Sequence, residues 1–555
     1  MARARAACLC FPPHWYYAAV PADLLYTGSY LLGQGIPTRV YDLSAGLLHH
    51  HLRGVPGFES LRQRDTYLSP TLYHQASEQV EHALDAVSAR FGCQYGLGRL
   101  SFPGVEESHL PAALAVGLDP LRNPALEYLQ RSIASILEPD PILVAVALVH
   151  PDQLVQTLVL GRLLRQAGYR GFLCIYGAHE DVLSPEDLIE DLLPVQGEPL
   201  HQFFADFDGA VIGEAESALA QLHQALSEGQ TLHHVPSLLA PRHGLSAVPV
   251  RGREKLRTLG RPEFSLINPS IYPYPEPLVD IRMSRGCPWS RCTFCAITMH
   301  QEGYRALPVP EVEPDLRAAH RLLRSSFFRF RDDLLTPKQL LSLSQVVRRL
   351  PFSARFSARS RFEPDLTFDV LSQAHDAGLE ELWLGLESAS PRVRSLMQKG
   401  VEQDVVERIL RDAERLGLRV RALCLIGYPG ETRAELQQTL DFLVTHQQAL
   451  VSAAITPFLL LRRSPLGQDP ASAGVTLLPD PLPRAERLRF VLPATWPDQP
   501  SPAALQDALG WAVERLGHRF VAMSSGPSLA HAMIHHSVRA RGWPKAAPTL
   551  PIVID

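Results

Sequence analysis

The sequence predicts an α/β protein in which two parallel sheets follow one another along the chain. Short apolar runs alternate with helical patterns both before and after residue 278, and glycine or proline brackets most of these runs. Strands that alternate with helices are typical of parallel sheets, because each helix carries the chain from one strand to the next. At 555 residues with 46% hydrophobic content, the chain is long enough for more than one domain.

The first sheet is predicted within residues 1–235, as a Rossmann-like, doubly wound domain. Its expected strands cover residues 7–11, 38–42, 142–149, 172–176 and 209–214. The last three of these runs are bracketed by breaking residues, which favours buried parallel strands over buried helices. Residues 49–129 have helical and irregular patterns and are predicted to be an insert. Residues 236–278 are rich in proline and lose periodicity, so they are predicted to be a linker.

The second sheet is predicted over residues 279–466. Its expected strands cover residues 278–283, 327–330, 354–359, 381–387 and 419–427, with helices between them. Successive strand–helix units predict a barrel-like parallel sheet whose functional residues lie at the carboxyl ends of the strands. The remaining segment, 467–555, begins with a proline-rich stretch and has two expected helices, at 503–516 and 528–541. It is predicted to be a small, mostly helical C-terminal extension that closes the open side of the barrel.

Composition argues against two classes of partner. The net charge of −5 gives no basic surface for nucleic acid, and no run of about 18 apolar residues could span a membrane. The apolar run near the N-terminus is too short for the core of a signal peptide. Five of the eight cysteines are isolated in apolar runs and are interpreted as small buried side chains. Without a disulfide pattern, a cytoplasmic location is expected.

The other three cysteines, Cys287, Cys292 and Cys295, form a C-x4-C-x2-C pattern on a loop after an expected strand. Such a cluster is compatible with a zinc site, an iron–sulfur cluster, a redox pair or disulfide, or a buried structural group. A closed zinc site needs a fourth ligand, which His300 could supply. An iron–sulfur cluster held by three local thiolates would have one iron without a protein ligand, free to chelate a small molecule.

The run Cys-Pro-Trp…Cys-Thr-Phe-Cys behind Ser-Arg-Gly resembles the radical S-adenosylmethionine (SAM) superfamily, in which the free iron binds the amino and carboxylate groups of SAM. The usual spacing there is C-x3-C-x2-C, and the longer form resembles a subset of cobalamin-binding members. Further motifs match that family in order and spacing: Asp332-Asp333, Ala358 to Arg361, Gly385 to Ser388, Met397 to Gly400, and Ile426 to Thr432. The resemblance covers residues 282–466 and implies a partial (β/α)6 barrel.

By this resemblance, the three loop cysteines are expected to hold a 4Fe-4S cluster. The residues expected to bind SAM are Phe294, Asp332, Arg359, Glu387, Gly427, Pro429 and Gly430. Glu387 and Arg359 would hold the polar part of SAM. The glycine turn would let the backbone approach the adenosine, since residues without a side chain leave room. Each of these assignments has a structural alternative. Glu387 could form a surface ion pair, and Arg359 could pair with a carboxylate inside the barrel. Residues 427–430 could be an ordinary strand-to-helix turn.

The order of the first five strands resembles the cobalamin-binding-like domain that precedes many radical SAM domains. In such a sheet, ligands bind at the carboxyl ends of the strands near a topological switch. The residues expected at this rim are Pro12, Pro13, Val149, His150, Gln153, Gly177, Ala178, His179, Gly213 and Glu214. Small or breaking residues there would leave room for a flat macrocycle. The Asp-x-His-x-x-Gly signature is absent, so no histidine is assigned to cobalt, and a sheet without a cofactor is the alternative.

The resemblance implies an enzyme that reductively cleaves SAM to a 5′-deoxyadenosyl radical and removes hydrogen from a substrate, with the cofactors carrying the chemistry. An external electron donor such as flavodoxin or ferredoxin is also implied. With cobalamin, the expected outcome is methylation of an unactivated carbon of a natural-product or peptide substrate. The alternatives are a rearrangement or oxidative cyclisation without methyl transfer, and a zinc-stabilised binding protein without catalysis. The sequence assigns neither the substrate nor the residues that transfer protons.

Overall fold

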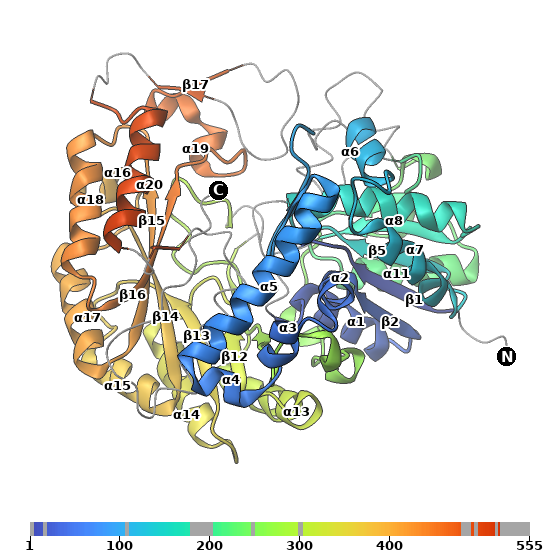
Figure 1. Cartoon of the computed structure of the whole chain (residues 1–555), viewed down its shortest axis with the longest axis horizontal. Helices are drawn as coiled ribbons and strands as arrows, with labels where there is room; N and C mark the ends of the chain where they lie inside the picture. Colours follow the sequence, from blue (N-terminus) through green and yellow to red (C-terminus); the bar gives the residue numbers. More distant parts are fainter. Residues whose placement is uncertain are drawn as a thin grey trace. The chain divides into compact units, whose positions relative to one another are not determined.

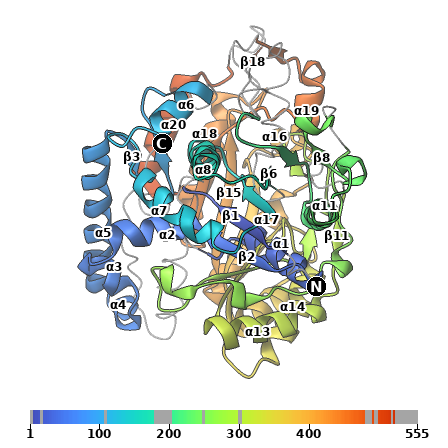
Figure 2. The ribbon, with the colours of Figure 1, turned by 90° about the vertical axis from the view of Figure 1, so that its right-hand side faces the viewer.

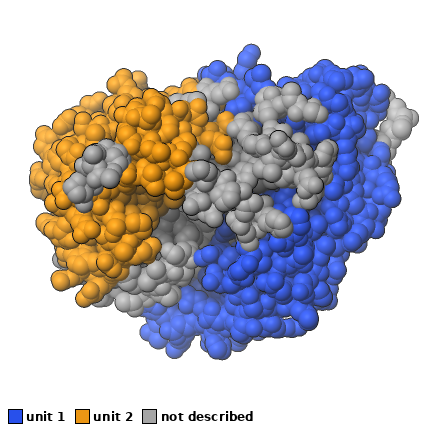
Figure 3. All heavy atoms as spheres, turned by 90° about the horizontal axis from the view of Figure 1, so that it is seen from above, with its two compact units in different colours: residues 1–277, 481–486 blue, residues 278–480, 487–555 orange. Residues whose placement is uncertain are grey.

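The computed structural model describes residues 5–14, 19–105, 110–177, 204–245, 250–297, 303–478, 490–492, 498–516 and 520–521. The chain divides into two compact units (Figure 3). Unit 1 comprises residues 1–277 with 481–486, and unit 2 comprises 278–480 with 487–555. Each unit contains one large sheet. Within the described ranges, no helix is both long and apolar enough to cross a membrane.

The large sheet of unit 1 has six strands in the order β2-β1-β5-β6-β7-β8 (Figure 1). Their bounds are β1 (Ala7–Phe11), β2 (Thr38–Asp42), β5 (Leu143–Ala147), β6 (Phe172–Tyr176), β7 (Gly209–Val211) and β8 (Leu238–Leu239). The first five pair in parallel, which confirms the predicted doubly wound sheet, and β8 pairs antiparallel with β7. The direction of winding reverses between β1 and β5, so the carboxyl ends of these two strands form the topological switch point.

Helices cover both faces of this sheet. They are α1 (Ala22–Gly33), α2 (Leu43–Leu52), α7 (Leu126–Leu137), α8 (Leu154–Gln166) and α11 (Glu216–Glu228). Apolar side chains of α1 and α11 join those of β1 in one core. On the opposite face the thiol of Cys8 lies 3.4 Å from a carbonyl oxygen of α7, and Figure 2 shows α7 and α8 on one side of β1 and α11 on the other. Strands β1, β5 and β6 are buried at every position, and burial on both faces explains why their residues are apolar throughout.

The region 49–129, predicted to be helical and irregular, adds four helices and a hairpin that the pattern did not resolve individually. The elements are α3 (Pro56–Leu61), α4 (Arg64–Leu68), α5 (Pro70–Phe91), β3 (Gln94–Tyr95), β4 (Leu100–Ser101) and α6 (Leu110–Gly117). The long helix α5 begins where the Ser69 hydroxyl accepts a hydrogen bond from the backbone and ends at Gly92, whose φ of 62° is left-handed. This cap and this glycine fix the helix length.

Residues 236–277, predicted to be a linker, pack instead on unit 1. Strand β8 extends the sheet, and Gly252 forms a β-bridge with Gly213. Further along, the backbone amide of Glu263 donates to the Ser29 hydroxyl at 2.7 Å. These contacts involve backbone groups and short polar side chains, so they leave no apolar periodicity in the sequence for a pattern to detect.

Asp42, at the end of β2, provides a pH-dependent contribution to the stability of unit 1. The Tyr272 hydroxyl donates to its carboxylate at 2.7 Å and the backbone amide of Ala45 donates at 2.9 Å, while burial raises the pKa of Asp42 to about 6. Because this pKa is raised in the folded state, its stabilisation is complete below about pH 4 and is lost as the pH rises through 6.

Replacing Asp42 with asparagine is therefore expected to remove about 2 kcal/mol of pH dependence between pH 4 and 7. The measurement is the urea unfolding midpoint of wild type and variant across that range. Asp65→Asn, at an exposed helical position, is the control and should follow the wild type. Parallel pH profiles for wild type and Asp42→Asn would contradict the expectation.

The large sheet of unit 2 has seven parallel strands in the order β9, β12, β13, β14, β15, β16, β19. Their bounds are β9 (Val279–Ile281), β12 (Phe327–Phe330), β13 (Arg355–Ser360), β14 (Leu379–Glu387), β15 (Arg419–Ile426), β16 (Leu450–Pro457) and β19 (Phe520–Val521). Six consecutive neighbouring strands confirm the partial (β/α)6 barrel, and β19 adds a short seventh strand.

The crossover helices lie on the outside of this sheet (Figure 1). They are α13 (Glu313–Leu323), α14 (Pro337–Arg348), α15 (Phe368–Ala377), α17 (Gln403–Leu416) and α18 (Arg433–Thr445). Capping boxes at Thr336 and Thr432 define where α14 and α18 begin. The C-terminal part contains α19 (Pro465–Gln468), β17 (Thr476–Leu477), β18 (Phe490–Val491) and α20 (Pro502–Leu516). The last of these confirms the helix predicted at 503–516, whereas 528–541 lies outside the described residues.

Candidate cluster and cofactor sites

The three loop cysteines follow the first strand of the barrel. After β9, a short strand β10 (Ser284–Arg285) pairs antiparallel with β11 (Arg305–Ala306). The loop that carries Cys287, Cys292 and Cys295 follows β10, and Cys287 lies two residues after its end. All eight cysteines are described and have free thiols; these three are partly exposed and the other five are buried. The interpretation of the isolated cysteines as buried side chains is thus confirmed, and only the three loop cysteines are partly exposed.

The cysteine loop is held by the turn that follows α16 (Pro391–Leu396) and by one arginine. The indole nitrogen of Trp289 donates to the carbonyl of Gln398 at 3.0 Å, and the backbone amide of Thr293 donates to the carbonyl of Met397 at 3.1 Å. The guanidinium of Arg361 stacks on the Trp289 ring, with its central carbon 3.7 Å from the ring centroid. These contacts fix the loop backbone between the first and third cysteines.

The extra residue of the C-x4-C spacing is accommodated by a turn. Ser290 has a left-handed φ of 49°, and its hydroxyl donates to the carbonyl of Cys287. Gly400 approaches the loop from the other side: a Cβ atom there would lie 2.4 Å from the Trp289 ring. The site therefore requires glycine at 400 both for its φ of 61° and for the space that Trp289 fills.

Changing Gly400 to alanine is expected to displace Trp289 and destabilise the loop by about 2 kcal/mol beyond the backbone strain. Gly417→Ala is the matched control, because Gly417 also has a left-handed φ, 67°, but has nothing within 4 Å of the new methyl group. After anaerobic reconstitution, iron should leave the Gly400 variant faster than the Gly417 variant when a chelator is added. Equal rates would show that Trp289 is not held by this contact.

Glu387 ends β14 beside the cysteine loop. It has a left-handed φ of 62°, at a register shift in the pairing of β14 with β15. Its carboxylate accepts a hydrogen bond at 2.7 Å from the Nζ of Lys399, and both side chains are about 10% exposed. Burial lowers the pKa of Lys399, but Glu387 and Cys292 outweigh it and raise this pKa overall. The pair is therefore a buried, charged contact, with the cation also close to Cys292.

Asp332 lies beneath the start of the cysteine loop. One carboxylate oxygen accepts hydrogen bonds from the backbone amide of Met283 at 3.1 Å and from the hydroxyl of Ser284 at 2.5 Å. The residue is fully buried, and burial raises the pKa of Asp332 to about 6. Asp332 thus anchors the strand that leads into the loop.

The predicted glycine turn follows β15. Gly427 and Gly430 both have left-handed φ values, of 80° and 85°. A Cβ atom on Gly427 would lie 2.7 Å from the side chain of Leu505 in α20. Gly427 was expected to leave space for the adenosine of SAM, but in the structure the side chain of Leu505 from α20 fills the space beside it. Phe294 packs against an apolar group that includes Tyr428.

Pro429 and Gly430 line a cavity of about 820 Å³ beside the cysteine loop. Its lining is mixed and includes backbone of the glycine turn: Thr293, Arg392, Leu396, Gln398, Tyr428, Pro429, Gly430, Glu431, Thr432, Leu466, Ser472, Ala473, Gly474, Asp498 and Gln499. The hydroxyls of Thr293 and Tyr428 are 2.7 Å apart, which ties the cysteine loop to the turn. The cavity therefore brings two of the predicted SAM residues next to the loop.

Sequence reasoning missed four residues of this region: Arg361, Lys399, Thr293 and Glu431. All four lie within motifs that the sequence analysis named, but no role followed from their spacing. Glu431 is fully buried, and one of its carboxylate oxygens accepts from the backbone amide of Gly427 at 2.5 Å. This hydrogen bond links the two ends of the glycine turn. Burial raises the pKa of Glu431 to about 7.

In unit 1, the side chain of Gln153 forms hydrogen bonds to both strand ends at the topological switch point. Its side-chain amide donates to the carbonyl of Pro12 at 2.9 Å and accepts from the backbone amides of Val149 and His150 at 3.0 and 3.1 Å. Gln153 therefore ties the carboxyl end of β1 to that of β5. Its hydrogen-bonding groups are used in holding the rim together.

Gly213 and Glu214 hold the segment that follows the sheet. A Cβ atom at Gly213 would lie 2.8 Å from the backbone nitrogen of Gly252, and the Glu214 carboxylate accepts from the backbone amide of Glu254. Gly213 is thus needed for close packing of two backbone segments, and it does not leave open space for a macrocycle. Of the described rim residues, only His150 is partly exposed; Ala178 and His179 lie outside the described residues.

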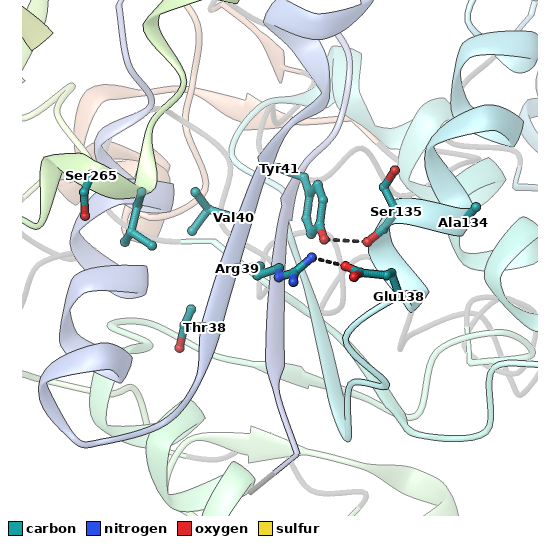
Figure 4. A pocket seen from close by; sticks show the side chains of 9 residues that line it. Thr38, Arg39, Val40, Tyr41, Ala134, Ser135, Glu138 and Ser265 are labelled. Atoms are coloured by element: carbon teal, nitrogen blue, oxygen red, sulfur yellow. Dashed lines mark hydrogen bonds and ion pairs between the residues drawn. The ribbon is translucent and has the colours of Figure 1, made fainter. Parts of the chain in front are cut away.

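A second cavity, of about 620 Å³, lies elsewhere in unit 1, along the edge strand β2 (Figure 4). The hydroxyl of Tyr41 donates to the carbonyl of Ser135, and Arg39 forms an ion pair with Glu138 across it. None of the predicted cofactor residues lines this cavity, so it is separate from the rim.

The residues at the cysteine loop fit an iron–sulfur cluster by chemistry and spacing. Three free, accessible thiols lie within nine residues, and thiolate is the ligand that such clusters require. Within the described part of the chain, no three His, Cys, Asp or Glu side chains are already gathered around one point as metal ligands. His300, the candidate fourth zinc ligand, lies outside the described residues.

Comparison with known proteins identifies the domain that carries this loop. Residues 281–443 match the Radical SAM superfamily. An uncharacterized methyltransferase of Pyrococcus horikoshii, PH0819, is 26% identical over 284 residues, which cover 48% of this chain and 61% of that protein. The ribosomal protein uS12 methylthiotransferase RimO of Xanthomonas campestris is 28% identical over 268 residues, which cover 41% of this chain and 51% of that protein. The chain thus spans between about half and three-fifths of these relatives.

Two solved structures share the fold over nearly the whole chain. TsrM from Kitasatospora setae, a radical SAM methyltransferase with cobalamin and a 4Fe-4S cluster bound, has a TM-score of 0.57 at 13% identity, covering 98% of this chain and 100% of TsrM. OxsB, a cobalamin-dependent SAM radical enzyme with aqua-cobalamin and SAM bound, has a TM-score of 0.59 at 13% identity, covering 92% and 66%. Residues 281–443 therefore form a domain of the Radical SAM superfamily, and the chain shares the fold of these two solved structures.

Proposed function

We propose that this protein binds a 4Fe-4S cluster, SAM and cobalamin, and methylates an unactivated carbon of a natural-product or peptide substrate. The observation that carries the proposal is the position of the only three accessible cysteines. They lie on the loop that follows the first barrel strand, beside the buried Glu387–Lys399 pair. A doubly wound sheet precedes the barrel, and two solved structures that contain cobalamin share the fold of this chain.

The bound cofactors would supply the electron and the methyl group, and the protein would bind and orient. Cys287, Cys292 and Cys295 would hold the cluster as thiolates. Glu387 would accept hydrogen bonds from the amino group of SAM, and Lys399, its ion-pair partner, would offer a cation to the carboxylate of SAM. Asp332 keeps the strand before the loop in place through Met283 and Ser284. The cavity beside Pro429 and Gly430 is the candidate place for the adenosine part.

Cobalamin binding distinguishes methyl transfer from other radical chemistry. Protein reconstituted with hydroxocobalamin and desalted is expected to retain about one cobalamin per chain, measured from its visible spectrum. His150→Trp should reduce retention, because His150 is the partly exposed residue of the described rim. Ser265→Trp, in the separate cavity along β2, is the matched control and should retain cobalamin. If wild type retains none while it still cleaves SAM, the function is a radical rearrangement or oxidative cyclisation without cobalamin.

A further inference from the structure

Residues 428–431 form a type II β-turn in the wall of the cavity beside the cysteine loop. The backbone amide of Glu431 closes the turn by donating to the carbonyl of Tyr428 at 2.9 Å. Pro429 stands at the second position, and Gly430 at the third has a left-handed φ of 85°, as this turn type requires. The amide of Gly430 is not used in closing the turn, and a carbonyl oxygen has a second lone pair. The turn therefore offers one donor and one acceptor to another group.

Both of these groups are taken by one side chain, the carboxamide of Gln499. Its oxygen accepts from the backbone amide of Gly430 at 2.8 Å, and its nitrogen donates to the carbonyl of Tyr428 at 3.1 Å. A backbone amide can only donate and a carbonyl can only accept, so the orientation of the carboxamide is fixed. We call the Tyr428 carbonyl and the Gly430 amide the turn pair. Gln499 thus holds the turn pair inside the cavity proposed above for the adenosine part of SAM.

Adenine presents the same kind of edge to such a pair as a carboxamide does. Its exocyclic amino group donates and a neighbouring ring nitrogen accepts, so adenine forms two hydrogen bonds with a group that offers one carbonyl oxygen and one N–H. The turn pair offers this combination. Leu396, Pro429 and Leu466 line the same cavity and supply apolar surface for the faces of a flat base. The carboxamide of Gln499 therefore occupies the groups that suit the base of SAM.

Only the side chain of Gln499 needs to move to release the turn pair. The backbone beside it is anchored, because the carbonyl of Asp498 accepts from the backbone amide of Arg433 at 2.9 Å. Further along, Leu505 fills the space beside Gly427, and its helix α20 lies beside α18 (Figure 1). The two hydrogen bonds of the carboxamide join neutral groups, which contribute little net stability each. A rotation of one long side chain is thus sufficient to open the site.

We infer that Gln499 is a side-chain gate on the adenosine site, which competes with the adenine of SAM for the turn pair and rotates away when SAM binds. The inference rests on the proposed radical SAM function and adds a control on how tightly SAM is held. Because SAM must displace the carboxamide, its apparent affinity is lowered by the fraction of chains in which the turn pair is free. The product 5′-deoxyadenosine carries the same base, so the return of Gln499 would also promote its release.

The test is equilibrium binding of SAM to reconstituted protein without a reductant, so that no SAM is consumed. Gln499→Met keeps the length of the side chain but forms neither hydrogen bond, and it is expected to lower the dissociation constant of SAM about tenfold. Gln468→Met is the matched control and should leave the constant unchanged. Gln468 is an exposed glutamine of α19 that donates to the carbonyl of Arg462 and does not line the cavity. Gln499→Asn, too short to hold both groups, should act in the same direction if the methionine variant does not fold.

Two nucleoside analogues test the contact with the base. In S-inosylhomocysteine a carbonyl replaces the amino group of adenine and the adjacent ring nitrogen carries a proton, so donor and acceptor are exchanged. Wild-type protein is therefore expected to bind S-inosylhomocysteine about tenfold or more weakly than S-adenosylhomocysteine. Equal affinities would overturn the inference, because the base would then lie away from the turn pair.

The SAM dissociation constants of the variants decide the role of Gln499. Equal constants for Gln499→Met and Gln468→Met would overturn the inference, because Gln499 would then not compete with the base. Weaker binding by Gln499→Met would also overturn it, by making Gln499 a support of the site. Iron content and SAM binding of the wild type are measured on the same samples. A wild type that holds its iron but binds no SAM would refute the proposed function itself, a result distinct from equal constants in the two variants.

Discussion

Replacing Cys287, Cys292 and Cys295 together with alanine is expected to lower the iron content from about four per chain to near zero. The same variant should release no 5′-deoxyadenosine. The physical reason is that thiolates are the ligands of such clusters, and the other five cysteines are buried away from the loop. The measurement is an iron assay and visible spectrum after anaerobic reconstitution, followed by product analysis with SAM and a strong reductant.

Cys174→Ala is the control for this experiment. Cys174 is fully buried in the sheet of unit 1, so its loss should leave a small packing defect but the full iron content. Stoichiometric zinc without iron in the wild-type protein would refute the cluster assignment and favour the zinc-stabilised binding protein. Full iron retention in the triple variant would show that the cluster has other ligands.

Replacing Glu387 with glutamine is expected to weaken SAM binding about thirtyfold or more while iron is retained. The carboxylate is replaced by a neutral amide, so the amino group of SAM loses its charged acceptor. The change also leaves Lys399 buried without its counter-charge, which is expected to cost about 3 kcal/mol of stability. Equilibrium binding of SAM, iron content and the denaturation midpoint are the three measurements.

The double variant Glu387→Gln with Lys399→Met separates the two effects. It removes both charges, so stability should return toward that of wild type because no buried cation is left unpaired. SAM binding should remain weak, since neither charged contact is available. If SAM binding recovers together with stability, Glu387 acts only through the ion pair and does not contact SAM.

Much of the architecture could be predicted because its signals are local. The runs at 7–11 and 38–42 became β1 and β2 with the same bounds, since the first is apolar and ends at Pro12-Pro13 and the second follows the glycines at 33 and 35. The cysteine loop was likewise visible from spacing alone. These features depend on residues that are close together in sequence, so a pattern can detect them.

The remaining parts of the site depend on contacts between distant residues. Glu387 and Lys399 are joined through a register shift and a turn that have no periodic signature. The contact of Gly427 with Leu505 brings together segments 78 residues apart, so the sequence showed a glycine but not what approaches it. The roles of the cluster, SAM and cobalamin residues therefore stay predictions, to be tested by the variants described above.

The bridge between Gly213 and Gly252, with β8 beside β7, has a consequence for any fragment of this protein. A fragment that ends at residue 235 would leave β7 as an uncovered edge strand, with backbone groups available to pair with other molecules. Such edges promote self-association. A fragment that ends at residue 277 keeps that edge paired and the Tyr272–Asp42 hydrogen bond intact, and should be the more soluble of the two.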